Sequence, residues 1–219
     1  MSSVDYWSCI QVSNRVVLDV GIGNSTRKVL DLGAKYVVGL DVDRRKIRGS
    51  IRDVRLDLVL GDCSRLPFRC DVFELVLFHF TLHEVAPYLH EDTIREAGRV
   101  GRGVAIVEIL PDDRGAYGLY ARLWHEAMHS VGRYEDYRDV DYWVSLVERC
   151  GLRVELVRVL PGSMVSLSEL EKVIENDIVE WRRLGVSEVY VQELRRVLEC
   201  ARVCGFRWSN TVLVVGVRM

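Results

Sequence analysis

The sequence predicts an α/β fold with a mostly parallel sheet, and three observations support this prediction. Short apolar runs alternate with segments of helical periodicity between residues 15 and 110, a pattern typical of parallel strands joined by right-handed crossovers. A last apolar run, residues 211–217, can return to the same sheet after a long helical stretch. The composition, 49% hydrophobic and 28% charged, is that of a folded chain with a sizeable core.

Seven segments have the apolar character of buried strands. Each is a short run dominated by valine, leucine and isoleucine. The expected strands are Arg15–Val20, Tyr36–Asp41, Leu56–Gly61, Phe73–His79, Gly103–Leu110, Leu152–Leu160 and Thr211–Val217.

Helical segments separate these runs. Asn24, Ser25 and Thr26 can cap a first helix that Gly33 stops, and a short helix of arginine and lysine follows the second strand. Aromatic residues and histidines recur at helical spacing from Arg114 to Tyr137. The other expected helices are Glu91–Val100, Asp141–Cys150, Leu167–Leu184 and Ser187–Val203.

The charge balance argues against a nucleic-acid-binding surface. Lys and Arg total 30 against 32 Asp and Glu, for a formal net charge of −2. One basic run could bind RNA, but acidic residues interleave with it, which favours an ion-paired, solvated face. The run consists of Arg44, Arg45, Lys46, Arg48, Arg52 and Arg55, and the acidic residues are Asp41, Asp43, Asp53 and Asp57.

The chain has the features of a cytoplasmic protein. No apolar run approaches 18 residues, so we expect no membrane span. Residues Met1–Tyr6 lack both the basic start and the apolar stretch of a signal peptide. Six cysteines in 219 residues do not form a disulfide scaffold, and they lack zinc-finger spacing.

The most informative segment joins the first strand to the first helix. In VLDVGIGNS (17–25), Gly21 and Gly23 permit a tight turn and close approach of the backbone to a ligand. Asp41 ends the next strand, where a carboxylate can accept hydrogen bonds from both hydroxyls of a ribose. Asp62 follows the third strand and can accept a hydrogen bond from an adenine amino group. This pattern predicts a nucleoside site at the strand ends.

Two nucleoside cofactors use such a layout, and the residues after Gly23 distinguish between them. The dinucleotide fingerprint requires a third glycine, at the position that Thr26 occupies here. Ser25 and Thr26 would also crowd a pyrophosphate. S-adenosylmethionine has no phosphate, so the sequence favours it over NAD.

The chain resembles the class I S-adenosylmethionine-dependent methyltransferases over most of residues 15–160. This family has a Rossmann-like, seven-stranded sheet whose last strand is antiparallel, and Thr211–Val217 is the candidate for that strand. The resemblance implies one domain, 1–219, with a cofactor-binding half at 15–110 and helical insertions at 111–138 and 162–205 that form a lid. The resembling segments are VLDVGIGNS (17–25), VVGLDVD (37–43), LVLGDCSRLPF (58–68), FELVLFHFTLHEV (73–85) and VAIVEILP (104–111).

The resemblance also implies which residues bind S-adenosylmethionine and its product S-adenosylhomocysteine. The turn after the first strand would flank the methionine part, Asp41 would hold the ribose, and Asp62 with Cys63 would hold the adenine. The sequence departs from the family at Ser25, where a third glycine is frequent, and in its short N-terminal segment, where only Tyr6 and Trp7 could cap the cofactor. The implied cofactor residues are Asp19, Gly21, Gly23, Asn24, Asp41, Val42, Asp62, Cys63, Phe78 and His79.

The reaction would be an in-line displacement of a methyl group from a sulfonium. Such an enzyme aligns the acceptor, excludes water and supplies a base where the acceptor carries a proton. His79, His83 and Glu84 are the candidate catalytic residues, with capping or packing as the alternative. His79 and His83 have i,i+4 spacing and His90 follows, but no continuous helix carries all three, so no metal site is predicted.

The acceptor is expected to lie in a pocket lined by Glu108 and by one face of the helical segment after it. That face carries Tyr117, Tyr120, Trp124 and His125, for which tight packing within the helical region is the alternative role. The Asn/Asp-Pro-Pro-Tyr/Phe sequence of many amino-methylating relatives is absent after the fourth strand, which argues against an adenine amine or a glutamine amide as acceptor.

The sequence therefore predicts an S-adenosylmethionine-dependent methyltransferase that acts on a small molecule. An RNA or protein methyltransferase and a non-catalytic module that binds S-adenosylmethionine are the alternatives. A homodimer is an open alternative to a monomer.

Overall fold

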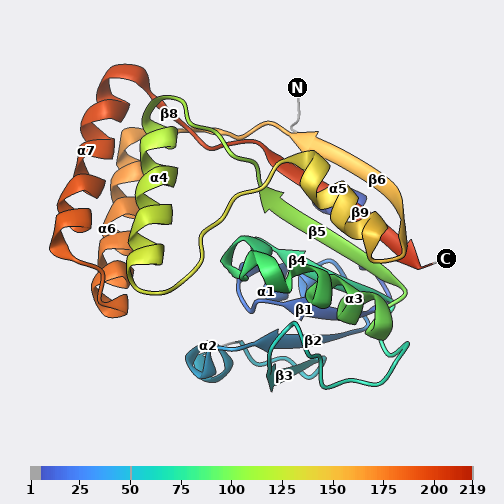
Figure 1. Cartoon of the computed structure of the whole chain (residues 1–219). Coiled ribbons are helices and arrows are strands. Elements are labelled where there is room, and N and C mark those ends of the chain that lie inside the picture. Colours follow the sequence, from blue (N-terminus) through green and yellow to red (C-terminus); the bar gives the residue numbers. More distant parts are fainter. Residues whose placement is uncertain (1–5, 50, 219) are drawn as a thin grey trace. The chain divides into compact units, whose positions relative to one another are not determined.

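A computed structural model describes residues 6–49 and 51–218 of the chain, so the expectation about a signal peptide at Met1–Tyr6 falls largely outside the described residues. A seven-stranded sheet has the order β3-β2-β1-β4-β5-β9-β6 (Figure 1). The expected α/β fold is confirmed. The strands are β1 (Val16–Val20), β2 (Tyr36–Asp41), β3 (Leu56–Leu60), β4 (Leu75–His79), β5 (Gly103–Ile109), β6 (Leu152–Leu160) and β9 (Thr211–Arg218).

Parallel pairing aligns the carboxyl ends of the first five strands. β1 pairs in parallel with β2 and β4, so that Leu18 lies opposite both Val38 and Val76. β3 extends the sheet beyond β2, and β5 extends it beyond β4, again in parallel.

The last strand runs in the opposite direction, as expected. Arg218 donates its backbone N–H to the carbonyl of Arg102 at 3.0 Å, and Leu110 donates to Asn210 at 2.8 Å. Residue numbers therefore increase along β5 in the direction in which they decrease along β9, which is the register of an antiparallel pair.

Helices cover both faces of the sheet. On one face, η1 (Tyr6–Cys9) and α1 (Asn24–Asp31) bury Trp7, Val29 and Leu30 against β1 and β4. On the other face, α3 (His90–Val100) and α5 (Val140–Arg149) lie side by side. A sheet covered in this way is buried on both faces, which explains the valine- and leucine-rich strands.

The chain separates into two compact units. The first contains the sheet: the residues up to Glu108, Asp139–Leu160 and the residues from Val212. The second consists of Ile109–Arg138 and Pro161–Thr211. The expected insertions, 111–138 and 162–205, fall within this second unit.

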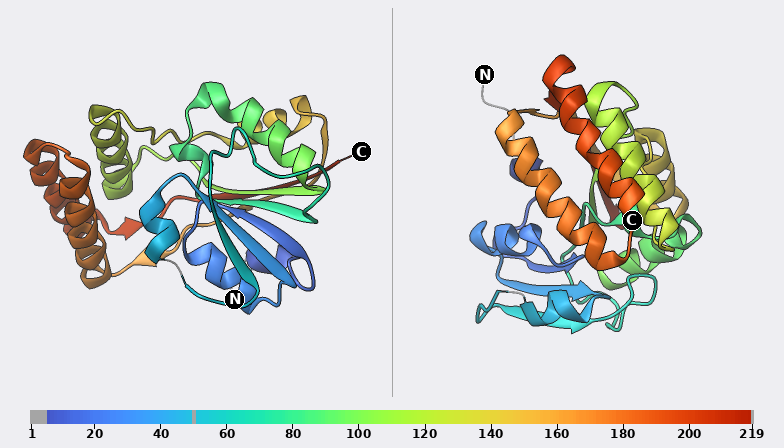
Figure 2. Two further views of the ribbon diagram at one scale, coloured as in Figure 1. Left: turned by 90° about the horizontal axis from the view of Figure 1, so that it is seen from below. Right: turned by 90° about the vertical axis from the view of Figure 1, so that its left-hand side faces the viewer.

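Three helices form the second unit, with α7 packed against both α4 and α6 (Figure 2). Ser166 begins α6 with a capping box to Glu169, and Gly185 ends it in the left-handed conformation. Trp181 and Leu194 are fully buried between the helices. The elements are α4 (Gly115–Ser130), α6 (Leu167–Leu184), α7 (Glu188–Cys204) and a small antiparallel pair, β7 (Met164–Val165) with β8 (Phe206–Arg207).

Some observed bounds differ from the expected ones. Helical spacing continues to Tyr137, but α4 ends at Ser130, because the chain turns back at Gly132 with φ of 72°. β4 begins at Leu75, since Phe73 forms only an isolated bridge to Gly101. The basic helix is present as α2 (Arg44–Gly49). Among the described residues, no helix is both long and apolar enough to cross a membrane.

Candidate functional site

The turn after β1 depends on a glycine at its first position. Gly21 has φ of +87° and donates its backbone N–H to Leu40 at 2.8 Å. Thr81, from the loop after β4, donates its hydroxyl to the Val20 carbonyl at 2.8 Å. A Cβ on Gly21 would lie 2.4 Å from Oγ1 of Thr81, so this position has no room for a side chain. The sequence pattern gives no sign of this contact with Thr81.

Gly23 differs from Gly21 both in its backbone conformation and in the space available for a side chain. Its φ of −170° is extended backbone that any residue can adopt. No described atom outside its immediate neighbours lies within 4 Å of the place where a Cβ would be. The described part of the chain therefore leaves the Gly23 backbone open to close approach by a ligand.

Asp19 lies beneath this turn and is fully buried. Its Oδ2 accepts hydrogen bonds from the hydroxyls of Ser25 at 3.0 Å and Thr26 at 2.6 Å. These two hydroxyls thus fasten the start of α1 to β1. Oδ1 of Asp19 has no hydrogen-bond partner in the described structure. Burial raises the pKa of Asp19 to about 7, against the opposing effect of the two hydroxyls.

This pKa predicts a pH-dependent stability. Because the folded state favours the protonated form of Asp19, protonation of this group stabilises the fold. The stabilisation is complete below about pH 4 and is lost as the pH rises through 7. Asp19→Asn removes this titration. Between pH 5 and 8 the free energy of unfolding of the wild type should fall by about 2–3 kcal/mol relative to the variant. Urea denaturation at both pH values measures this, and parallel pH profiles would contradict the assignment.

Asp41 supports the same turn from the neighbouring strand. Its two carboxylate oxygens accept from the backbone N–H groups of Ile22 at 2.9 Å and Asp43 at 2.8 Å. Lys46 places its Nζ 3.4 Å from Oδ2. The carboxylate is only 6% exposed, yet each oxygen retains a second lone pair for a ligand. Asn24 and Val42, the two neighbours expected to touch the cofactor, are exposed.

Asp62 and Cys63 follow β3 at the same edge of the sheet. Asp62 is exposed, and its Oδ1 accepts from the backbone N–H and the hydroxyl of Ser64, both at 2.8 Å. Cys63 is buried with its sulfur 3.8 Å from Oγ1 of Thr93, and burial raises the pKa of its thiol. Cys63 therefore stays a protonated thiol at neutral pH.

His79 ends β4 and packs among aromatic rings. Its Nε2 hydrogen-bonds with the Tyr6 hydroxyl at 2.8 Å, and its ring stacks on Trp7 with centroids 5.0 Å apart. Burial lowers the pKa of His79 to about 4, although the Glu108 charge opposes this shift. His79 is therefore neutral at pH 7. Phe78, which the resemblance also assigns to the cofactor, is fully buried.

Glu108 organises the turn after β4. It is fully buried near the end of β5, and Oε1 accepts from the backbone N–H groups of Thr81 at 2.8 Å and Leu82 at 2.6 Å. His83 donates Nδ1–H to Oε2 at 2.6 Å. Glu84, by contrast, is exposed. The structure thus brings His83 and Glu108 together, with Glu108 in a supporting position.

His90 has a structural role in the same turn. It is fully buried and donates Nε2–H to the carbonyls of Leu82 at 2.9 Å and Val85 at 3.0 Å. Its Nδ1 accepts from the Tyr142 hydroxyl at 2.7 Å. His79, His83 and His90 each have different hydrogen-bond partners.

The aromatic residues expected to line an acceptor pocket lie in the second unit. Tyr117 and Tyr120 are buried in its core beside Phe206, and Tyr120 donates its hydroxyl to Asp177 at 2.9 Å. Trp124 packs edge-on against Trp181. Two cavities open within this unit: Tyr117 lines one of about 510 Å³, and His125 lines one of about 650 Å³.

Comparison with known proteins agrees with this architecture. Residues 18–106 match the family described as methyltransferase domain. The structure superposes on the YcgJ protein of Bacillus subtilis with a TM-score of 0.65 and 16% identity, covering 96% of this chain and 95% of the other. Residues 18–106 are thus similar to a methyltransferase domain, and the chain has a Rossmann-like methyltransferase fold.

Two further structures have the same fold. A SAM-dependent methyltransferase of Methanosarcina mazei has a TM-score of 0.60 and 13% identity over 97% of this chain and 96% of its own. The cyclase SpnF has a TM-score of 0.60 and 14% identity over 95% of this chain and 76% of its own. No curated protein sequence matches the chain. Because a methyltransferase and a cyclase share this fold, the fold alone does not decide the activity of this chain, and its own site residues have to be considered.

Proposed function

We propose that this chain transfers a methyl group from S-adenosylmethionine to a small-molecule acceptor by in-line displacement. The open backbone at Gly23 carries this proposal, since the turn needs no glycine there for its own sake. β1, β2 and β3 are adjacent and parallel, so Gly23, Asp41 and Asp62 share one edge of the sheet. Ligands of open α/β sheets bind at the carboxyl edge.

The residues at this edge fit the cofactor. The remaining lone pairs of Asp41 suit two ribose hydroxyls, and the exposed carboxylate of Asp62 suits an adenine amino group. The methionine part would approach the Gly23 backbone. Oδ1 of Asp19, buried and without a partner, is an acceptor at the base of that turn.

S-adenosylmethionine supplies the electrophilic methyl group when bound. The residues of this chain would align the acceptor, exclude water and accept its proton. We assign the role of the base that accepts the acceptor's proton to His83, because Glu108 fixes the His83 ring by the hydrogen bond to Nδ1. His79 is too weak a base at a pKa of about 4 and would shape the site instead. Glu84 is exposed and could orient an acceptor.

The charge distribution favours a small acceptor over RNA. Arg45 and Arg55 of the basic run pair with Asp43 and Asp53 at 3.2 and 3.1 Å, and Lys46 lies near Asp41. These cations are partly neutralised, which reduces their attraction for phosphates. A salt-sensitive gel shift with RNA would favour the alternative acceptor.

Asp41→Ala is the variant that tests the cofactor assignment. It should weaken binding of S-adenosylmethionine by about 1.5–3 kcal/mol through the loss of charge-assisted hydrogen bonds to the ribose. Isothermal titration calorimetry measures this. The matched control is Asp31→Asn, which removes one carboxylate from an exposed i,i+4 pair with Arg27 on α1. Equal affinity in all three proteins would contradict the role of Asp41.

A thermal-shift titration tests the function more broadly. A ligand at about 100 times its dissociation constant stabilises a protein by about 2.7 kcal/mol. S-adenosylmethionine and S-adenosylhomocysteine should raise the melting temperature, and NAD and NADP should not. Stabilisation by NAD or NADP alone would overturn the proposal. Binding without methyl transfer to any of a panel of acceptors would favour the non-catalytic module.

A further inference from the structure

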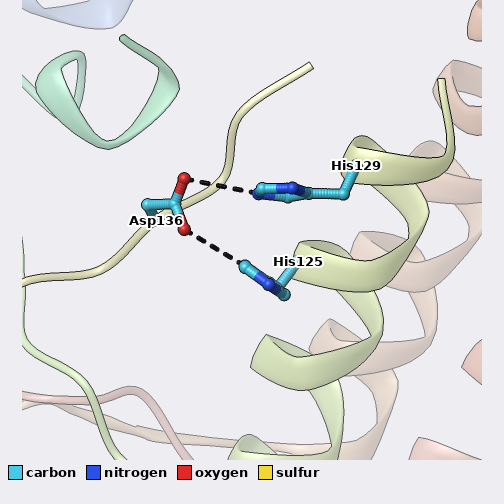
Figure 3. Close-up of side chains that lie close together, drawn as sticks. All are labelled: His125, His129 and Asp136. Carbon is cyan, nitrogen blue, oxygen red and sulfur yellow. Dashed lines mark ion pairs between the residues drawn. The ribbon is translucent and has the colours of Figure 1, made fainter. Parts of the chain in front are cut away.

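A cluster of two histidines and one aspartate lies in the second unit, and none of the three is among the residues assigned to the cofactor. His125 and His129 are one turn apart on α4, with ring centroids 4.2 Å from each other. Asp136 lies on the segment that follows α4. Figure 3 shows both imidazole rings directed at its carboxylate.

The distances in this cluster match the spacing of ligands around one metal ion. Nδ1 of His125 is 3.5 Å from Oδ1 of Asp136, and Nε2 of His129 is 3.3 Å from Oδ2. A tetrahedral ion with bonds of about 2.0–2.1 Å separates its ligand atoms by about 3.4 Å. One ligand atom from each of the three residues lies within 4.8 Å of the other two. Small rotations of the imidazoles would complete the site.

The backbone brings Asp136 to this position without help from an ion. Gly132 takes φ of 72°, and Arg133 donates its N–H to the Met128 carbonyl at 2.9 Å, so the chain turns back along α4. The Glu135 carbonyl then accepts from Nδ1 of His125 at 2.9 Å. An ion bound at Nδ1 would displace this proton to solvent.

We propose that His125, His129 and Asp136 bind a divalent transition-metal ion of the zinc class. Two imidazole nitrogens and one carboxylate suit Zn²⁺ or Co²⁺, whereas Mg²⁺ and Ca²⁺ prefer oxygen ligands throughout. The side chains are 46%, 40% and 17% exposed, so an ion can enter from solvent. The bound ion fastens the segment after α4 to that helix.

Three protein ligands leave a fourth position on the ion. Zinc sites of this composition hold a water or a substrate group there. His125 and Asp136 both line the cavity of about 650 Å³, whose wall also carries Asp112, Arg114 and Arg122. The ion therefore borders a space that can admit a small ligand.

Two alternatives to this metal site have to be distinguished from it. The two histidines could form only ion pairs with Asp136, in which case no metal binds. On α7 the sulfurs of Cys200 and Cys204 are 3.6 Å apart and offer two soft ligands. Zinc bound to the protein could therefore belong to the thiols.

The test uses the full chain after treatment with a chelator and dialysis. Titration with Zn²⁺ by calorimetry, and with Co²⁺ by absorption, should give one ion per chain. Asp136→Asn and His129→Ala should each weaken binding by about 10–100-fold or more. The control on the same helix is Glu126→Gln, whose carboxylate pairs with Arg122 at 4.0 Å, and it should bind like the wild type.

The double variant Cys200→Ser/Cys204→Ser separates the two candidate sites. It should retain full binding, with the Co²⁺ spectrum unchanged. Circular dichroism of the metal-free variants checks that each is folded, and the exposure of His129 favours this. The proposal is overturned if the wild type binds no ion, or if binding survives in Asp136→Asn and His129→Ala but is lost in the cysteine variant. These readouts are independent of methyl transfer.

Discussion

Replacing Glu108 with alanine should lower the free energy of unfolding by about 3–5 kcal/mol, because buried donors would lose their acceptor. The carboxylate accepts from two backbone N–H groups, those of Thr81 and Leu82, and from His83, and it is fully buried. Water cannot replace it without a rearrangement of the turn after β4. Urea denaturation at pH 7 measures the change through the transition midpoint.

Two further variants make this prediction specific. Glu108→Gln keeps an oxygen that can accept from the two backbone groups and loses only the bond to His83, so its cost should be about 1–2 kcal/mol. Glu74→Ala is the matched control, since Glu74 accepts a single backbone bond, from Val16 at 2.9 Å, and is exposed. It should cost less than about 1 kcal/mol. Equal losses in Glu108→Ala and Glu74→Ala would show that the buried network contributes little.

Glu108 also illustrates the limit of sequence reasoning about this site. Its position at a strand end predicts a side chain at the ligand-binding edge, and from there a role in the acceptor pocket. The structure shows that its donors come from residues 25–27 positions away, two of them backbone groups. Backbone donors carry no residue signature, so the sequence cannot distinguish a ligand-facing carboxylate from one that holds a turn.

The elements themselves were predictable because local patterns determine them. Runs of valine and leucine of strand length mark β1 and β2, and Asp41 ends β2 where parallel strands present ligand-binding residues. The contacts between distant loops were not. Thr81 reaches the Val20 carbonyl across 61 residues. Asp136 reaches α4 because the helix ends at Ser130 and the chain turns back at Gly132. Neither contact leaves a local pattern in the sequence from which it could be predicted.

Gly21→Ala and Gly23→Ala should have opposite consequences, although the two glycines are only two positions apart. Alanine at 21 meets both a φ of +87° and the Thr81 hydroxyl at 2.4 Å. The backbone strain costs about 1–3 kcal/mol, and the steric conflict costs a similar amount. We therefore expect Gly21→Ala to lose about 2–6 kcal/mol of stability in urea denaturation.

Gly23→Ala should remain within about 1 kcal/mol of the wild type, because an extended φ accepts alanine and the position only begins α1. Its methyl group would instead occupy the open space that we assign to the methionine part of the cofactor. Affinity for S-adenosylmethionine should then fall by about tenfold or more, which corresponds to about 1.4 kcal/mol. A stable Gly23→Ala protein with unchanged affinity would mean that the open backbone serves no ligand, and the cofactor would have to be sought away from the turn after β1. Loss of stability in Gly23→Ala as large as in Gly21→Ala would mean instead that both glycines serve the fold.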